Sequence, residues 1–361
     1  MKSKQKIITI LGTRPEVIRL CKIIPKIDKF FKNILVHTGQ NFDYELDKIF
    51  FKDLGVRKPD YFLHCKGSFA DQLGKIASKL EKIILKEKPD KFLVLGDTNS
   101  SLGSIVAKRL GVQVFHMEAG NRSFNSESPE EVNRKLIDHS SDILMPYTQR
   151  SMENLVAEGI ERRKIFISGN PINEVMNSFK KNIDSSIIKE QIKVKSKNFI
   201  LVTLHRQENV DNKYNLNNIF KKLAEVATIL NKLIVFPIHP RTKKNLKKYK
   251  IKYSKKILLL KPLGFFDFIN LEQDAYCVIT DSGTVQEECA ILKVPVIVAR
   301  DSTERPETME SGSAIISGKK MINLLNLIKF QVKHNLQDQI KEYDVNNVSN
   351  KVLKILISNH L

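Results

Sequence analysis

The alternation of short apolar runs with longer amphipathic runs constrains the fold of this chain most strongly. The short runs are apolar almost throughout, which is typical of strands in a parallel sheet that is covered on both faces. They lie at Ile7–Leu11, Ile34–His37, Lys91–Leu95, Gln113–Met117, Phe199–Thr203, Leu233–Ile238, Ile257–Leu260, Cys277–Thr280 and Val294–Val298. The pattern predicts an α/β protein built on doubly wound parallel sheets.

Length and spacing predict two domains. A chain of 361 residues is long for one core, and such chains usually divide into domains of about 100 to 200 residues. We expect an N-terminal Rossmann-like domain at 1–176, an interdomain crossing at 177–198, a C-terminal Rossmann-like domain at 199–335, and a helical segment at 336–361 that packs back on the first domain. Because ligands bind at the carboxyl ends of parallel strands, we expect the two sheets to face a central cleft.

The composition excludes several classes of protein. The net charge of +20 is mostly dispersed lysine, densest at 243–256 with few aromatic residues, which favours a solvated surface over a nucleic-acid-binding module. No apolar run approaches the roughly 20 residues that span a bilayer, and the N-terminus lacks a signal-peptide cleavage site. We therefore expect a cytoplasmic protein that binds neither nucleic acid nor membrane.

The four cysteines indicate neither a disulfide framework nor a zinc site. Cys21, Cys65, Cys277 and Cys289 are scattered without paired spacing, whereas both kinds of site need clustered residues. The chain also lacks the GxGxxG fingerprint of a nicotinamide cofactor site. We expect reduced, structural cysteines, no metal and no cofactor.

The stretch at 281–288 joins an apolar run to a helix-like run and predicts a nucleotide site. The first turn of a helix leaves backbone N–H groups unpaired and carries partial positive charge, so it binds phosphate well. Ser282 adds a hydroxyl, and Gly283 lets a ligand approach the backbone. Glu288 can accept hydrogen bonds from ribose hydroxyls. The alternative is an ordinary helix capped by serine.

Candidate acids and a candidate arginine follow strands of the first half. Arg14 comes after the first strand, Asp97 and Glu118 come after the strands at 91–95 and 113–117, and Glu130 precedes a helical run. Three carboxylates on one side of a sheet repel one another, which raises the pKa of at least one and supplies a proton acceptor and a proton donor. Taken alone, each of these three acids also fits the role of a residue that caps a helix or is solvated at the surface.

The second half repeats this arrangement with cations. His205 and His239 each follow a strand and lie next to Arg206 and Arg241, and Arg305 follows the last strand. A lone histidine at a strand end is more often a hydrogen-bonded structural residue. Two histidines beside arginines at matching positions favour binding of a diphosphate.

Taken together, the motifs resemble the non-hydrolysing UDP-N-acetylglucosamine 2-epimerase family, whose members act on sugar nucleotides and have the two-domain glycosyltransferase-B fold. The likeness runs from about residue 7 to residue 318. Its elements are GTRPE (12–16), HTGQ (37–40), GDTNS (96–100), EAGNR (118–122), PEEVNR (129–134), HRQEN (205–209), HPR (239–241), DSGTVQEE (281–288) and TERPE (303–307).

The resemblance implies roles for the candidate residues. The acids would serve proton transfers at C2 of the sugar. Arg14 and His205 would contact the diphosphate, and the other candidate residues of the second half would hold UDP and sugar. The candidate catalytic residues are Asp97, Glu118, Glu130 and His205. The candidate substrate-binding residues are Arg14, Arg19, His239, Arg241, Phe268, Ser282, Gly283, Thr284, Glu288 and Arg305. The resemblance also implies a homodimer.

The expected activity is interconversion of UDP-N-acetylglucosamine and UDP-N-acetylmannosamine through a bound glycal, for bacterial surface polysaccharide precursors. The chain departs from the family at Arg19, where lysine is usual, at Thr284, where a second glycine is common, and in EAGNR, which replaces EAGLR. EAGNR resembles a sister group acting on UDP-2-acetamido-2,6-dideoxy-L-talose, so that substrate is an alternative. A glycosyltransferase of the same fold and a hydrolysing 2-epimerase are further alternatives, although the former has little use for three acids.

Overall fold

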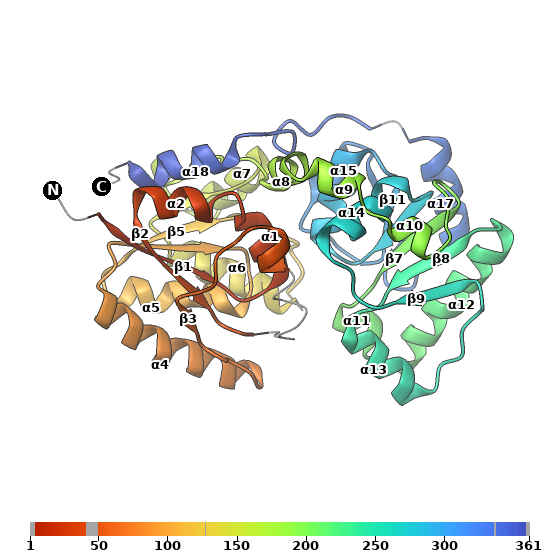
Figure 1. Cartoon of the computed structure of the whole chain (residues 1–361), viewed down its shortest axis with the longest axis horizontal. Helices are drawn as coiled ribbons and strands as arrows, with labels where there is room; N and C mark the ends of the chain where they lie inside the picture. Colours follow the sequence, from red (N-terminus) through yellow and green to blue (C-terminus); the bar gives the residue numbers. More distant parts are fainter. Residues whose placement is uncertain (1–3, 41–49, 127, 336, 359–361) are drawn as a thin grey trace. The chain divides into compact units, whose positions relative to one another are not determined.

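The structure is a computed structural model that describes residues 4–40, 50–126, 128–335 and 337–358. The chain forms two compact units (Figure 1). Unit 1 contains residues 1–178 and 342–361, and unit 2 contains residues 179–341. The segment predicted as the interdomain crossing, 177–198, therefore falls largely within unit 2. Of the predicted C-terminal segment, 336–361, residues 342–361 fall within unit 1.

Unit 1 contains a six-stranded sheet with helices between its strands. Its strands are β1 (Lys6–Leu11), β2 (Lys32–His37), β3 (Tyr61–Phe62), β4 (Lys91–Leu95), β5 (Gln113–Met117) and β6 (Ile143–Met145). Its α-helices are α1 (Arg14–Leu20), α2 (Ile24–Phe30), α4 (Phe69–Glu87), α5 (Gly103–Arg109), α6 (Pro129–His139), α7 (Gln149–Ala157), α8 (Ile172–Ser178) and α18 (Val348–Ile357), with short 3₁₀ helices at Asn99–Leu102 and Arg162–Lys164.

Unit 2 contains a second six-stranded sheet. Its strands are β7 (Phe199–Thr203), β8 (Leu233–Pro237), β9 (Ile257–Leu260), β10 (Cys277–Thr280), β11 (Val296–Val298) and β12 (Ala314–Ile316). Its helices are α9 (Lys180–Asp184), α10 (Ile188–Gln191), α11 (Gln207–Val210), α12 (Lys213–Ile229), α13 (Pro240–Tyr249), α14 (Phe265–Asp274), α15 (Gly283–Leu292), α16 (Pro306–Glu310) and α17 (Leu324–Lys333).

The two sheets share one topology. The order is β3-β2-β1-β4-β5-β6 in unit 1 and β9-β8-β7-β10-β11-β12 in unit 2, and every pairing is parallel. In this order the chain starts in the middle, builds out to one edge, and returns to the middle to build the other half. The prediction of doubly wound parallel sheets is confirmed. The order reverses between β1 and β4 in unit 1 and between β7 and β10 in unit 2.

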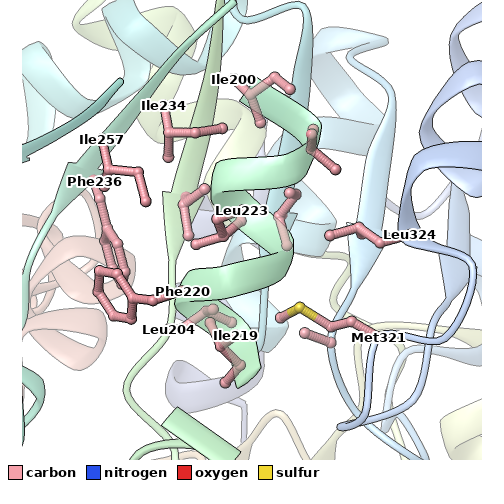
Figure 2. Packing of buried hydrophobic residues seen from close by; sticks show 14 of the residues in the cluster. Ile200, Leu204, Ile219, Phe220, Leu223, Ile234, Phe236, Ile257, Met321 and Leu324 are labelled. Carbon is pink, nitrogen blue, oxygen red and sulfur yellow. The ribbon is translucent and has the colours of Figure 1, made fainter. Parts of the chain in front are cut away.

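Period-2 alternation distributes the strand residues of unit 2 between two cores. Ile200 and Val202 join one buried cluster with α12 and α17, whereas Phe199 and Leu201 join another with α14 and α15. Both sets are apolar because neither face of this sheet meets water. Figure 2 shows the first cluster, in which Phe220 and Leu223 of α12 lie against the sheet.

The C-terminal helix belongs to unit 1. Helix α18 packs against α2 (Figure 1). The Lys26 ammonium donates to Ser349 Oγ at 2.6 Å, and Ser349 N donates to Glu174 Oε2 of α8 at 2.8 Å. In the described part of the chain, no helix combines the length and apolar character that crossing a bilayer requires.

We expect Leu223→Ala to destabilise unit 2 by about 2–5 kcal/mol, because the side chain is fully buried against the sheet and its loss leaves a cavity. Ile229→Ala is the matched control, since Ile229 lies on the same helix and is 52% exposed. Its effect should stay within about 0.5 kcal/mol. Urea unfolding followed by circular dichroism measures both. Equal shifts in the two variants would contradict the observed packing of α12.

Candidate active site

The candidate residues cluster at the two points where strand order reverses. In unit 1 the turns after β1 and β4 carry Arg14 and Asp97, and in unit 2 the turns after β7 and β10 carry His205 and Ser282. In open parallel sheets a crevice forms at the carboxyl ends of the strands at such a reversal. The topology therefore gives each unit one preferred ligand position.

A buried carboxyl group joins the two turns of unit 1. Glu16 of α1 accepts hydrogen bonds at Oε2 from Gly12 N at 2.8 Å and Thr13 N at 2.7 Å, and at Oε1 from Thr98 Oγ1 at 2.9 Å. Burial raises the pKa of Glu16 to about 7, although these hydrogen bonds act in the opposite direction. The side chain therefore fastens the turn after β4 to the turn after β1.

Gly12 allows the strand ends to approach closely. A Cβ atom at this position would lie 2.1 Å from both Ser100 Oγ and Thr38 Oγ1, closer than any real contact. Those two hydroxyl groups are themselves 2.7 Å apart. The GTRPE, HTGQ and GDTNS motifs thus meet at one place because the first begins with glycine.

Glu118 lies in the turn after β5 and is fixed by two neighbours. Arg19 of α1 forms a buried ion pair with Glu118 Oε2, and Asn121 Nδ2 donates to Oε1 at 3.3 Å. A Cβ atom on Gly96 would lie 3.2 Å from Glu118 Oε2, so the carboxylate packs over the turn that carries Asp97. Arg19, a candidate substrate-binding residue, thus contacts a candidate catalytic acid.

Asp97 and Glu130 are connected through helix α6. Arg134 forms ion pairs with Asp97 Oδ2 at 2.6 Å and with Glu131 Oε2 at 2.8 Å. Glu130, half-buried in the first turn of α6, accepts a hydrogen bond from Ser128 Oγ at 2.8 Å. The sequence predicts mutual repulsion among three acids, whereas the structure also places an arginine beside Asp97 and another beside Glu118.

Arg14 begins helix α1 and is half-buried. Its guanidinium carbon lies 5.6 Å from the centroid of the Phe50 ring, a cation–π distance. The residue thus lies at the strand end where the sequence predicts it.

Unit 2 has its own buried carboxylate at the strand reversal. Asp281, which is fully buried, accepts hydrogen bonds at Oδ2 from His205 N at 3.0 Å, Arg206 N at 2.9 Å and Asn209 Nδ2 at 2.9 Å. Its Oδ1 lies 3.3 Å from His205 Nδ1. Asp281 therefore ties the turn after β10 to the turn after β7 and orients the His205 ring.

Helix α15 begins directly after this turn. Ser282 is its N-cap, yet the hydroxyl makes no capping bond to the first turn. Gly283 and Thr284 open the helix, and a Cβ atom on Gly283 would lie 2.6 Å from Glu304 Oε1. Glu288 lies further along the helix and is 4% exposed.

Three other candidates have protein partners. Arg305 is buried, pairs with Glu287 through Nε, and donates from NH1 to the Glu304 carbonyl at 3.2 Å. Arg241 pairs with Asp211, with 2.8 Å between Nε and Oδ1. Phe268 packs against the core formed by α14 and α15.

The two candidate histidines are neighbours. His239 is the N-cap of α13 and accepts a hydrogen bond from Arg241 N at 3.2 Å. The centroid of its ring lies 5.5 Å from that of His205. The structure therefore brings together the two strand ends of the second half at which the sequence shows a histidine beside an arginine.

Sequence reasoning missed Glu16, Arg134 and Asp281 as organising residues. Arg134 had a usable signal, because it lies three and four positions after Glu131 and Glu130 and therefore shares their helix face. The other two lie inside quoted motifs, but only the strand pairing reveals which turns they connect. In the described residues, no three His, Cys, Asp or Glu side chains form a group able to hold a metal ion.

Glu272 is a further buried acid, which lies on α14 and faces α15. Its Oε1 accepts from Cys289 Sγ at 3.2 Å, and its buried Oε2 has no hydrogen-bond partner in the described part of unit 2. Burial raises the pKa of Glu272 from 4.5 to about 8. A neutral carboxyl group thus lies under the helix that carries the candidate nucleotide site.

Comparisons with known proteins give one consistent result. A family model described as UDP-N-acetylglucosamine 2-epimerase matches residues 26–357. The chain is 44% identical over 342 residues to the UDP-N-acetylglucosamine 2-epimerase of Methanocaldococcus jannaschii, covering 91% of this chain and 92% of that protein. It is 36% identical over 358 residues to the UDP-2,3-diacetamido-2,3-dideoxy-D-glucuronate 2-epimerase of Pseudomonas aeruginosa. This match covers 97% of this chain and 99% of that protein.

A solved structure is similar over nearly its whole length. The crystal structure of the M. jannaschii UDP-GlcNAc 2-epimerase in complex with UDP-GlcNAc and UDP superposes with a TM-score of 0.92 at 41% sequence identity, covering 98% of this chain and 99% of that chain.

The position of Glu272 predicts a pH dependence of stability. Between pH 4.5 and about 8 the folded protein holds this proton and the unfolded chain has lost it, so stability should fall as pH rises through that range. Glu272→Gln removes the effect. As pH rises, the free energy of unfolding of the variant should therefore increase relative to that of the wild type, by on the order of a few kcal/mol at pH 8.

Urea unfolding at pH 5, 6.5 and 8 measures this difference. Glu225→Gln, which changes an exposed acid of the same unit, is the control and should track the wild type. If the free energies of unfolding of Glu272→Gln and the wild type differed by the same amount at all three pH values, the raised pKa of Glu272 would be contradicted.

Proposed function

Because the chain belongs to the UDP-N-acetylglucosamine 2-epimerase family, we propose that it interconverts UDP-N-acetylglucosamine and UDP-N-acetylmannosamine by inverting C2 of the sugar. Family membership confirms the resemblance found in the sequence and makes the protein an epimerase, and therefore an isomerase. One observation of the structure supports the chemistry best: Asp97 and Glu118 lie at neighbouring strand ends, each paired with an arginine.

The proposed reaction is an elimination followed by an addition. A carboxylate of unit 1 removes the proton from C2, the bond between C1 and the UDP oxygen breaks, and a double bond forms between C1 and C2. UDP leaves with the electron pair. It then adds back to C1 while an acid returns a proton to the opposite face of C2. Both steps need a group that accepts a proton and a group that donates one.

Asp97, Glu118 and Glu130 are our candidates for these transfers. Arg19 and Arg134 hold the first two by charge-assisted hydrogen bonds, which fix the direction in which each carboxylate points. Glu130 lies on the same helix as Arg134.

We assign UDP to unit 2. Backbone N–H groups at the start of α15 suit the diphosphate, since a helix N-terminus favours an anion. The Ser282 hydroxyl makes no capping bond, and Gly283 adds no Cβ atom to the turn. His205 is oriented by Asp281 through Nδ1, which leaves Nε2 as the nitrogen for a phosphate oxygen. Glu288 suits the ribose hydroxyls.

The relatives favour this substrate over the alternatives. The M. jannaschii protein is named a UDP-N-acetylglucosamine 2-epimerase and its structure contains UDP-GlcNAc and UDP, whereas the P. aeruginosa relative is named for a diacetamido glucuronate. The talose derivative remains the second candidate because of Asn121 in the EAGNR motif, whose side chain contacts Glu118 directly.

By family resemblance we further propose a cytoplasmic homodimer that supplies precursors for a surface polysaccharide. Light scattering coupled to size-exclusion chromatography measures the mass, which should be twice the 41.4 kDa of one chain. A single-chain mass at micromolar concentration would contradict the dimer.

We expect Asp97→Asn, Glu118→Gln and Glu130→Gln each to lower turnover by about 100-fold or more, because each keeps the side-chain shape and removes the group that transfers the proton. UDP binding should stay near normal, since the proposed UDP site lies in unit 2. Glu81→Gln, an exposed acid of unit 1, is the matched control.

Proton NMR in deuterated water tests the mechanism and the substrate together. The wild type should place solvent deuterium at C2 when given UDP-N-acetylglucosamine, and the three variants should slow this exchange and epimerisation equally. Turnover of the talose derivative alone would select the second candidate. Product without deuterium, together with near-normal turnover in the variants, would rule out elimination and re-addition.

A further inference from the structure

A buried histidine and a buried aspartate lie behind the candidate acids of unit 1. His116 of β5 is 1% exposed and Asp138 of α6 is fully buried, and their atoms Nδ1 and Oδ1 are 2.8 Å apart. The other ring nitrogen, Nε2, lies 3.1 Å from the carbonyl oxygen of Gly96. No role in the proposed reaction has yet been given to either residue.

The neighbours of His116 hold both of its ring nitrogens. The Gly96 carbonyl oxygen can only accept a hydrogen bond, so Nε2 carries a hydrogen. Burial alone would raise the pKa of Asp138, but hydrogen bonds from His116 and Arg122 and the charge of Arg122 hold that pKa below its usual value. Nδ1 therefore faces a buried carboxylate whose other oxygen, Oδ2, pairs with Arg122.

Arg122 supplies the positive charge beside this buried carboxylate. It pairs with Asp138 at 2.8 Å and with Glu158 at 2.5 Å, and the Glu158 side chain is 24% exposed and also faces His139. Because an unpaired buried charge is costly, the guanidinium holds the Asp138 side chain in place.

The pair holds both turns that carry candidate acids. His116 Nε2 fixes the carbonyl of Gly96, the residue before Asp97, and Asp138 Oδ2 accepts from Gly120 N at 3.2 Å, two residues after Glu118. The turn after β5 needs such support, because Glu118 has a φ value of 65°. A left-handed conformation is strained at a residue other than glycine, so the backbone at Glu118 must be held by its surroundings.

Asp138 also connects these turns to the third acid. It lies on α6, the helix that carries Glu130 and Arg134, and Arg134 pairs with Asp97. One carboxylate therefore sets the relative positions of the two strand-end turns and the helix.

We propose that His116, held by Asp138, is a positioning residue that sets the turns of Asp97 and Glu118 for proton transfer at C2. This inference rests on the proposed epimerase function. It assigns no contact with substrate to either residue, and displacements of about 1 Å at reacting groups are enough to cost up to about 100-fold in rate.

Two variants separate the two hydrogen bonds of the ring. His116→Asn retains a donor near the Nδ1 position, toward Asp138, and loses the one that reaches Gly96. Asp138→Asn lets His116 keep Nε2–H toward Gly96 while its Nδ1 accepts from the new amide. We expect His116→Asn to lower kcat by about tenfold to 100-fold and Asp138→Asn to lower it less, both with unchanged UDP affinity and little change in KM. His64→Asn, which changes an exposed histidine of unit 1, is the control.

Nitrogen NMR of the histidine rings gives a readout that needs no turnover. His116 should carry hydrogen on Nε2 in the wild type and in Asp138→Asn, because the Gly96 carbonyl oxygen accepts there. A ring without hydrogen on Nε2, or wild-type kcat in His116→Asn, would overturn the proposal. If kcat and the melting temperature fell together in both variants, the two residues would have a purely structural role, and the proposal would be overturned as well. An inactive wild type would instead reject the proposed function, leaving the NMR result to stand by itself.

Discussion

Buried carboxylates that collect hydrogen-bond donors at strand ends are the interactions on which both units depend. Glu16 accepts the backbone N–H groups of Gly12 and Thr13 together with the Thr98 hydroxyl, and Asp281 accepts those of His205 and Arg206. A turn that ends a buried strand leaves N–H groups without a ladder partner, and an unpaired buried donor is costly. One carboxylate satisfies several of them and at the same time joins the two turns at the reversal of strand order.

This arrangement explains how flexible loops can carry a precise site. The turns after β1 and β10 follow largely buried strands and end in helices whose first residues, Arg14 and Gly283, are candidate site residues. The carboxylates of Glu16 and Asp281 join these turns to their neighbours. Chemistry at the site needs groups held to within about half an ångström, which loops provide only with such support. In unit 1 Arg134 pairs with Asp97 and His116 contacts the Gly96 carbonyl, so the turn that carries Asp97 is held by two further residues.

Much of the fold was predictable because buried parallel strands leave a clear pattern. All nine strands expected from apolar runs are present, with ends that differ by two residues at most, and the helix-like run predicted in the stretch at 281–288 corresponds to α15, which begins at Gly283. The strands β3, β6 and β12 were missed. They have two or three residues each, too few to show a period, and they lie at the edges of the two sheets.

The sequence by itself determined which residue types stand at the strand ends, because the motifs there can be read without knowing what lies beside them. It therefore identified the candidate acids, the helix that suits a diphosphate, and the family. Only the tertiary structure decided how those residues pair. Arg19 meets Glu118 across 99 positions and Asp281 meets His205 across 76. Such contacts arise from the order in which strands lie side by side, and no local pattern encodes that order. The same holds for the two contacts of the His116 ring, since Gly96 lies in the turn after β4 and Asp138 lies on α6.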